Sequence, residues 1–203
     1  MKSYRGENFT REWNEDPYAP ELWDAMKIIR SDASAGFEAL SYLAGQGSAL
    51  AMMYLAGAYL RGQYGIQKDR THGEHWLRRS ANAGSIEGKY GLGWYYEENG
   101  KIEEAIDIYE KLIKLNFSPA GYTLGRLYFK GEKVQKDLNK SLYFLNKSRN
   151  LGHLRATNLI CHIKINYSNN LFEKIYGYLI RFEMLFQWIF QAFKNPKSDR
   201  FKG

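Results

Sequence analysis

The chain has 203 residues, of which 44% are hydrophobic and 16% aromatic, and its formal net charge at pH 7 is +7. This length suits one elongated domain or a domain with a tail, and four prolines without a low-complexity run argue against long disordered stretches. The single cysteine, Cys161, excludes an internal disulfide. We interpret it as a small buried hydrophobe, because no histidine or acid stands at catalytic spacing from it.

Residues 1–20 are polar, with Phe9, Trp13 and Tyr18 as the strong apolar anchors. We interpret this segment as an extended arm that lies over the first helices. Met1 is not followed by the apolar core of a signal peptide, which predicts a cytoplasmic protein.

The next two elements are helices that we expect to cap the fold. Pro20 is well placed to begin a helix, and apolar residues at helical spacing follow it: Leu22, Trp23, Met26 and Ile29. Residues 34–44 predict a second helix, with Gly36 at a close-packing position and Gly47 as its terminator. Residues 1–47 are therefore expected to form an N-terminal arm and capping helices.

A repeated pattern begins at residue 48. Leu55, Leu92 and Leu124 correspond at spacings of 37 and 32 residues; each is followed by a small residue and, four positions after the leucine, by a tyrosine. A period in the thirties indicates a helical solenoid, whose units must stack because none can bury its apolar stripe alone. We divide the repeat region, 48–167, into units 48–84, 85–117 and 118–152 and a half unit, 153–167.

Each unit has the pattern of two paired helices. Gly62 and Gly131 end the first helices, because glycine accepts a left-handed cap without steric cost. Asp69 and Asp137 stand where the second helices begin, so each can cap exposed backbone amides. Trp76 supplies the bulk between the helices of its unit, and we predict that it is nearly buried.

Residues 49–84 resemble a Sel1-like repeat, a variant of the tetratricopeptide repeat with a longer, glycine-containing loop between its helices. Gly131, Val134 and Asp137 match that loop in the third unit, where Lys133 replaces a usual glycine. The middle unit is similar to an ordinary tetratricopeptide repeat. The resemblance covers roughly residues 34–165 and implies an all-α, right-handed solenoid of helical hairpins. It also implies a scaffold that binds proteins or peptides, often linked in bacteria to envelope or polysaccharide processes.

The resemblance also implies which side chains line the concave surface: those two and five residues before and after the leucine of each first helix. These predicted partner-binding residues are Met53, Leu60, Tyr90, Trp94, Glu97, Tyr122, Arg126, Phe129, Arg155, Asn158 and His162. Aromatic and arginine side chains are the usual anchors of binding surfaces. The alternative is that the C-terminal helix or a neighbouring chain fills this groove permanently.

Charge is unevenly distributed along the repeats. Residues 97–110 contain six acids and one lysine, whereas residues 126–155 contain eight basic residues and two acids. We favour solvated faces and ion pairing between the second and third units over a nucleic-acid surface, because the basic residues are scattered at helical positions. The sequence therefore disfavours nucleic acid as a partner.

The histidines give little indication of a chemical site. His72 and His75 are three positions apart on one helix, but only Glu74 is near them in sequence and it points elsewhere, so we expect no metal site. His153 stands at a helix start, a common surface position in the family that the chain resembles. No catalytic constellation is evident, and we expect neither a cofactor nor enzyme activity.

Residues 171–203 predict an amphipathic aromatic helix followed by a basic tail. Its predicted membrane or oligomer contacts are Phe182, Phe186, Trp188, Ile189 and Phe193. Arg181 and Glu183 interrupt the apolar run, so the helix is no membrane span. Three occupants of its apolar face stay open: the last repeat, a second copy in a homodimer, or a membrane surface.

Together these patterns predict a non-enzymatic adaptor that binds a peptide or helix in its concave face. We expect it to work in the cytoplasm, or at the inner face of the membrane if the C-terminal helix anchors it. The alternative is a nucleic-acid or regulatory binding module that uses the basic third unit.

Overall fold

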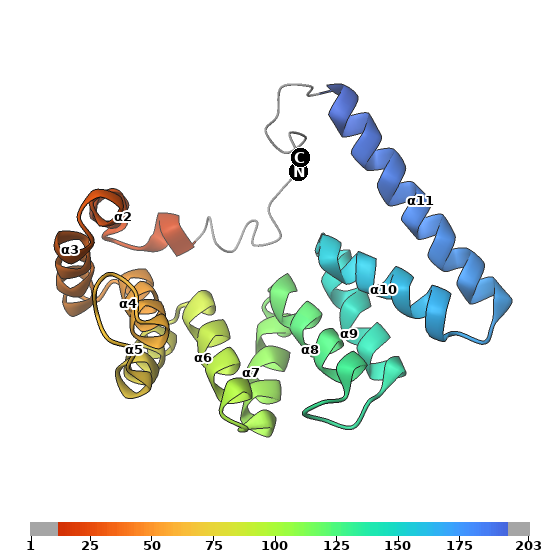
Figure 1. Ribbon diagram of the computed structural model, residues 1–203, viewed down its shortest axis with the longest axis horizontal. Helices are drawn as coiled ribbons and strands as arrows, with labels where there is room; N and C mark the ends of the chain where they lie inside the picture. The colour runs from red at the N-terminus through yellow and green to blue at the C-terminus, as the bar shows by residue number, and fades with distance from the viewer. Residues whose placement is uncertain (1–11, 195–203) are drawn as a thin grey trace.

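The computed structural model describes residues 12–194, apart from the side chains at positions 187, 188, 191, 192 and 194. A helical turn at residues 12–15 is followed by helices in antiparallel pairs that succeed one another along an arc (Figure 1). The helices are α2 (Ala19–Ser31), α3 (Ala33–Gly45), α4 (Ala49–Arg61), α5 (Arg70–Asn82), α6 (Ile86–Glu98), α7 (Ile102–Lys114), α8 (Ser118–Lys130), α9 (Leu138–Asn150), α10 (Leu154–Tyr167) and α11 (Leu171–Lys194).

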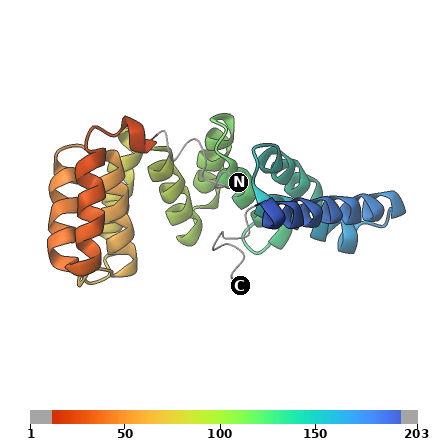
Figure 2. The ribbon, with the colours of Figure 1, turned by 90° about the horizontal axis from the view of Figure 1, so that it is seen from above.

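The fold is an all-α, right-handed solenoid of helical hairpins, as the resemblance described above implied. The second helices α3, α5, α7 and α9 each contact both the first helix of their own hairpin and the first helix of the next hairpin. Seen from above, the hairpins lie side by side, with α11 extending past the last of them (Figure 2). The described residues contain no β-strand.

The helix ends follow the predicted local chemistry. The carboxylates of Asp69 and Asp137 each accept a 2.9 Å hydrogen bond from a backbone amide in the first turn of α5 and α9. Gly62 and Gly131 adopt left-handed conformations, with φ of 65° and 70°. Asn116, at the end of α7, also has a positive φ of 59°, a conformation that asparagine tolerates better than most residues. The predicted helix ends are therefore confirmed.

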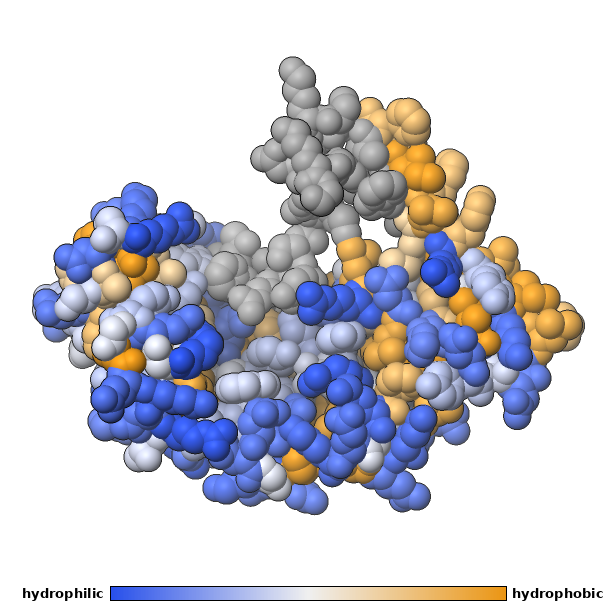
Figure 3. Space-filling model, in the orientation of Figure 1, coloured by the Kyte–Doolittle hydropathy of each residue, from blue (hydrophilic) through white to orange (hydrophobic). Residues whose placement is uncertain are grey.

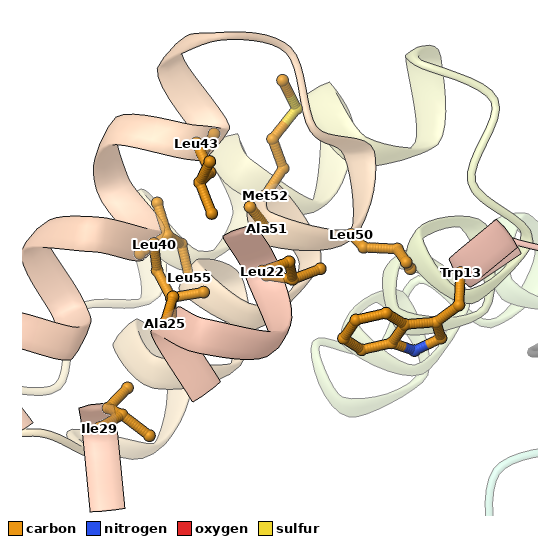
Figure 4. Packing of buried hydrophobic residues seen from close by; sticks show 11 residues of the cluster. Trp13, Leu22, Ala25, Ile29, Leu40, Leu43, Leu50, Ala51, Met52 and Leu55 are labelled. Carbon is orange, nitrogen blue, oxygen red and sulfur yellow. The ribbon is translucent and has the colours of Figure 1, made fainter. Parts of the chain in front are cut away.

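The N-terminal end of the solenoid is closed by its own hydrophobic cluster. Leu22 of α2, Leu40 of α3, and Leu50 and Leu55 of α4 are buried together, and Trp13 from the preceding turn packs against them (Figure 4). Burying each leucine contributes roughly 1.5–3 kcal/mol to stability. Helices α2 and α3 thus shield α4 from solvent at this end.

The prediction of a nearly buried Trp76 was wrong. Its indole is only partly buried, at the edge of the N-terminal cluster, and the guanidinium of Arg79 lies 4.7 Å from its ring centre. Leu77, one position further along α5, is the buried residue. One position rotates the side chain by about 100° around a helix, which moves it from the helix boundary into the core.

Small residues allow the paired helices to approach closely. A Cβ atom added at Gly125 of α8 would lie 2.4 Å from Cγ of Leu145 on α9. The buried hydroxyl of Ser141 donates a 2.7 Å hydrogen bond to the carbonyl of the same glycine. The small residue that follows the repeated leucine is therefore a packing requirement, as the sequence pattern indicated.

Candidate binding surface

Tyr90, a predicted concave residue of α6, contacts residues in and next to the neighbouring first helix α8. The hydroxyl of Tyr90 lies 2.8 Å from the hydroxyl of Thr123, and its ring packs against Phe117 with centroids 5.3 Å apart. Burial raises the pKa of the Tyr90 phenol, so this group stays protonated at neutral pH. Tyr90 therefore connects the second unit to the third.

Glu97 is the centre of an ionic cluster between the same units. Its side chain is only 4% exposed, and a guanidinium nitrogen of Arg126 lies 3.5 Å from its carboxylate. The phenol of Tyr109 donates a 3.2 Å hydrogen bond to the other carboxylate oxygen. Burial, reinforced by the Glu97 charge, raises the pKa of Tyr109 well above its ordinary value. Two of the predicted partner-binding residues, Glu97 and Arg126, are therefore bound to each other.

Lys133 completes this cluster from the loop between α8 and α9. Its ammonium lies 3.4 Å from the Glu97 carboxylate and 2.8 Å from that of Glu98, and it holds the pKa of Glu98 below the usual range. The predicted ion pairing between the second and third units is thus confirmed. The sequence analysis did not identify Lys133 as a member of this cluster. The replacement of the glycine usual at this loop position could have indicated it.

A shallow hollow of about 250 Å³ lies beside this cluster and is lined by Glu97, Glu98, Arg126, Leu127, Lys130, Glu132 and Lys133. Acidic and basic groups alternate around it, so it offers no single sign of charge to a ligand. Ion pairs between the second and third units form part of its walls. The hollow therefore lies at the junction of these two units.

His153 was predicted at the surface, and the structure corrects this. The side chain is 1% exposed and stacks on Tyr122, with ring centroids 4.8 Å apart. Its Nδ1 accepts a 3.2 Å hydrogen bond from the backbone amide of Ala156. Burial, assisted by the charge of Arg155, lowers its pKa to about 4, so the imidazole is neutral. His153 is thus a buried N-cap between α8 and α10.

The remaining predicted concave residues differ in how much they are exposed. Trp94 is 45% exposed on α6, and Arg155, Asn158 and His162 are exposed on α10. The others, which are Met53, Leu60, Tyr122 and Phe129, are partly buried. Trp94 and the α10 side chains are therefore the members of the predicted partner-binding set that are most accessible, and a role for the set in binding stays a prediction.

The described part of the N-terminal segment contacts the repeats, but residues 12–15 form a helical turn instead of the extended arm that was expected. The Asp16 carboxylate accepts hydrogen bonds from the Ser48 hydroxyl at 2.9 Å and the Leu50 amide at 3.3 Å. The Glu12 carboxylate accepts a 3.0 Å hydrogen bond from the Ser85 hydroxyl. The predicted anchor Phe9 lies outside the described residues. Residues 12–16 therefore bind the N-terminal ends of both α4 and α6.

The outer face of α11 is the most hydrophobic exposed surface of the described chain. Phe182, Phe186, Ile189 and Phe193, all predicted contact residues, are exposed; the side chain of Trp188 lies outside the described set. Figure 3 shows hydrophobic residues gathered at this end of the molecule. None of the described helices is both long enough and apolar enough to cross a bilayer.

His72 and Cys161, the two other residues considered for metal binding or catalysis, both occupy structural positions. Nδ1 of His72 lies 2.7 Å from the Asp69 carboxylate, and its ring stacks on Tyr59. Within residues 12–194, no three histidine, cysteine or acidic side chains are grouped closely enough to hold a metal. Cys161 is buried, and burial raises its thiol pKa, which is the reverse of what a nucleophilic cysteine requires.

Comparison with known proteins supports the repeat architecture. Residues 49–85 and 119–153 match the model of the Sel1 repeat family. A solved Sel1 repeat protein from Oxalobacter formigenes is similar with a TM-score of 0.67 and 18% identity, over 85% of this chain and 77% of that one. A Pseudomonas aeruginosa structure has a TM-score of 0.55 and 18% identity, over 83% of this chain and 68% of that one.

A third similar structure is a protective antigen of uropathogenic Escherichia coli strains that displays an SLR fold. It has a TM-score of 0.62 and 21% identity over 77% of this chain, which spans only 35% of the antigen's length. At such identities these structures establish the fold alone. No curated protein matches the chain significantly.

Proposed function

Because this chain is a Sel1-repeat protein, we propose that it is a non-enzymatic scaffold that binds a peptide segment or helix of a partner in its concave face. Sel1-repeat folds generally mediate protein–protein interaction and are generally non-catalytic. Repeat solenoids present extended concave surfaces for such contacts. The partner's identity is not part of this proposal, only the class of ligand and the surface that receives it.

The observation that carries this proposal is the exposure of Trp94. A tryptophan that is 45% exposed leaves a large apolar surface in water, while its neighbour Tyr96 on the same helix is buried. Tryptophan is among the residues most enriched at the energetic centres of interfaces. The adjacent Glu97–Arg126 pair fixes α6 against α8, so the indole is presented by a rigid surface. Such preorganisation reduces the entropy lost on binding.

The exposed side chains of α10 extend the surface with polar groups. Arg155, Asn158 and His162 offer a cation, an amide and an imidazole at helical spacing. A polar rim beside an aromatic anchor is the usual composition of a transient interface. We therefore expect the bound segment to combine an apolar anchor with polar or acidic side chains.

Affinity capture with the purified chain tests the proposal. Trp94→Ala should lose the captured partner, whereas Tyr143→Ala, which removes an exposed aromatic from second helix α9, should retain it. Both variants should unfold at nearly the wild-type denaturant concentration. Equal capture by the two variants would contradict the proposal.

The nucleic-acid alternative uses the basic side chains of the third unit. Arg126 and Lys133 are paired with Glu97, and Lys136, Lys140 and Lys147 each lie over an aromatic ring. These basic groups already contact carboxylates or aromatic rings, whereas nucleic-acid binding needs them to contact phosphates. Capture of RNA or DNA that weakens steeply with salt would favour it, and salt-insensitive capture of a protein favours the scaffold.

The place of action also belongs to the proposal. We place the scaffold in the cytoplasm or on the inner face of the membrane, in a bacterial envelope or polysaccharide process. Fractionation of cells that express the tagged chain tests this location. Recovery outside both fractions would contradict it.

A further inference from the structure

Helix α11 completes the fourth repeat unit, which the sequence pattern presented as half a unit. Gly177 follows Cys161 by sixteen positions, as Ser141 follows Gly125 in the third unit. A Cβ atom at Gly177 would lie 3.0 Å from Ile165 and 3.4 Å from the Cys161 carbonyl, so α11 approaches α10 as closely as earlier second helices approach their partners. The last hairpin is therefore α10–α11, and α11 is its extended second helix.

Helix α11 carries apolar side chains on both of its faces, and only one of them is buried. Toward α10, the helix places Gly177, the buried Ile180 and an ion pair between Glu173 and Lys164. The face that points away from α10 is apolar and exposed. Because α11 lies at the end of the arc (Figures 1 and 3), no described element covers that face.

The exposed side chains on this face form one regular row. Its members are Leu171, Ile175, Tyr178, Phe182, Leu185 and Ile189, each 38–68% exposed. Their spacing alternates between four and three residues, which is the 3.5-residue period of helices that pack along one another. We refer to this row as the α11 seam. Its spacing is the same from either end, so it matches a copy of itself running in the opposite direction.

Exposed phenylalanines make the apolar area of this helix large. Phe182 of the seam, and Phe172, Phe186, Phe190 and Phe193 outside it, are each 60–82% exposed. At roughly 150–250 Å² per aromatic side chain, they leave on the order of 700 Å² in water. A stable interface buries about 800 Å² per partner, so this face alone nearly supplies one side of a dimer.

The two ends of the solenoid favour a two-fold contact, in which the α11 ends of two copies meet, over a head-to-tail contact. Arg181 occupies the position at which Leu77 and Leu145 are buried beneath the following hairpin, which disfavours a further repeat stacked in the same manner. At the opposite end, α2 exposes Trp23 and Ile28, but the charged Asp24 and Lys27 lie between them, so it offers no continuous apolar row. A head-to-tail contact therefore leaves the seam poorly covered, whereas a two-fold contact covers both seams at once.

We propose that the α11 seam is the interface of a homodimer in which the α11 helices of two copies pack antiparallel. In this arrangement Leu171 lies opposite Ile189 of the second copy, Ile175 opposite its Leu185, and Tyr178 opposite its Phe182. A membrane is the less favoured occupant, because α11 itself carries only three basic residues against two acidic ones, and the further basic residues lie in the tail after it. Membrane-surface helices carry their lysines and arginines on the polar face of the helix. The interface is separate from the concave face, so its failure leaves the proposed scaffold function standing.

Sedimentation velocity over a broad concentration series tests the dimer. Phe182→Glu should weaken self-association by about tenfold or more, because it places a charge at the centre of the interface. Tyr42→Glu on α3 is the matched control, since Tyr42 and Phe182 are both 67% exposed, and it should dimerise like the unmodified chain. A chain that is monomeric throughout, or equal dimerisation by the two variants, would overturn the proposal.

Two further measurements test the arrangement and the competing occupant. On oxidation, a mixture of Leu171→Cys and Ile189→Cys should form a disulfide between copies that neither variant forms alone; Leu171→Cys that links to itself overturns the antiparallel arrangement. The unmodified chain, with Cys161 buried, is the background control. A monomeric chain that binds anionic lipid vesicles, and no longer does so as Phe182→Glu, overturns the dimer in favour of a membrane.

Discussion

The hydroxyl of Ser48 donates a 2.9 Å hydrogen bond to the carboxylate of Asp16, which precedes it by 32 positions. The same hydroxyl oxygen caps α4 by accepting a 3.0 Å hydrogen bond from the Ala51 amide. Four residues before Asp16, Glu12 makes the equivalent contact with Ser85, the N-cap of α6. Two carboxylates from one turn thus hold the N-terminal ends of two successive first helices, and negative charge is favourable at both positions.

This contact predicts that Asp16 stabilises the folded chain. Asp16→Ala would leave the buried Ser48 hydroxyl and the Leu50 amide without their acceptor, which costs about 1–3 kcal/mol. Urea denaturation measures the loss. Asp24→Ala is the control, because Asp24 is an exposed partner of Lys27 and its loss should cost less than about 1 kcal/mol. Equal midpoints for the two variants would show that the Asp16 contact contributes nothing.

Charge reversal at Arg126 is expected to destabilise the protein, whatever it does to partner binding. Arg126, a predicted partner-binding residue, lies 3.5 Å from the buried carboxylate of Glu97. Arg126→Glu would bring two carboxylates together and should cost about 1–2 kcal/mol, since Arg126 itself is partly exposed. Thermal or urea unfolding checks this, with Lys130→Glu on the same helix as the control.

A double-mutant cycle separates this effect from a general loss of packing. In a Glu97→Gln background the second carboxylate is absent, so Arg126→Glu should cost measurably less than in the unmodified chain. An identical cost in both backgrounds would mean that the two residues do not interact energetically. The ionic cluster would then be a consequence of helix packing rather than a contribution to it.

Local features of this fold could be predicted from sequence, because their causes are local. Asp69 caps an adjacent helix and Gly62 turns the chain within a few residues, so short patterns were sufficient. The burial of Glu97 and His153 could not be predicted in this way. Glu97 is enclosed by Tyr109 from α7 and by Lys133 from the loop between α8 and α9, and neither contact leaves a signal at position 97 itself.

The role of α11 as a second helix did have a sequence signal. Gly177 repeats the spacing between the small residues of paired helices, but the aromatic composition of the segment obscured it. Arg181, at a position that is apolar in earlier units, also breaks the repeat. Similarly, Trp76 was assigned to the core because of its size, although the helix directs Leu77 there instead.

Substitution of Leu77 should reduce stability more than substitution of Trp76, the reverse of what the sequence pattern predicted. Leu77→Ala creates a cavity in the core and should cost about 2–5 kcal/mol. Trp76→Ala removes a partly exposed ring and one cation–π contact with Arg79, so it should cost less than the 3–5 kcal/mol expected of a buried tryptophan. Chemical denaturation of both variants gives the comparison. A larger loss for Trp76→Ala would restore the original core assignment.

The last prediction concerns the pH dependence of stability between pH 6.5 and 4. Burial, with the charge of Arg155, lowers the His153 pKa from 6.5 to about 4, so the folded chain binds this proton more weakly than the unfolded chain. His153 therefore stabilises the fold fully above pH 6.5, and this contribution is lost progressively as pH falls toward 4. The loss amounts to about 3 kcal/mol, at 1.36 kcal/mol for each pKa unit. His153→Asn keeps a side chain that can cap α10 but does not titrate, so its unfolding free energy should change less over this interval. His75→Gln removes an exposed histidine and should retain the wild-type slope. Equal slopes for all three proteins in urea denaturation at successive pH values would mean that His153 does not become buried in its neutral form.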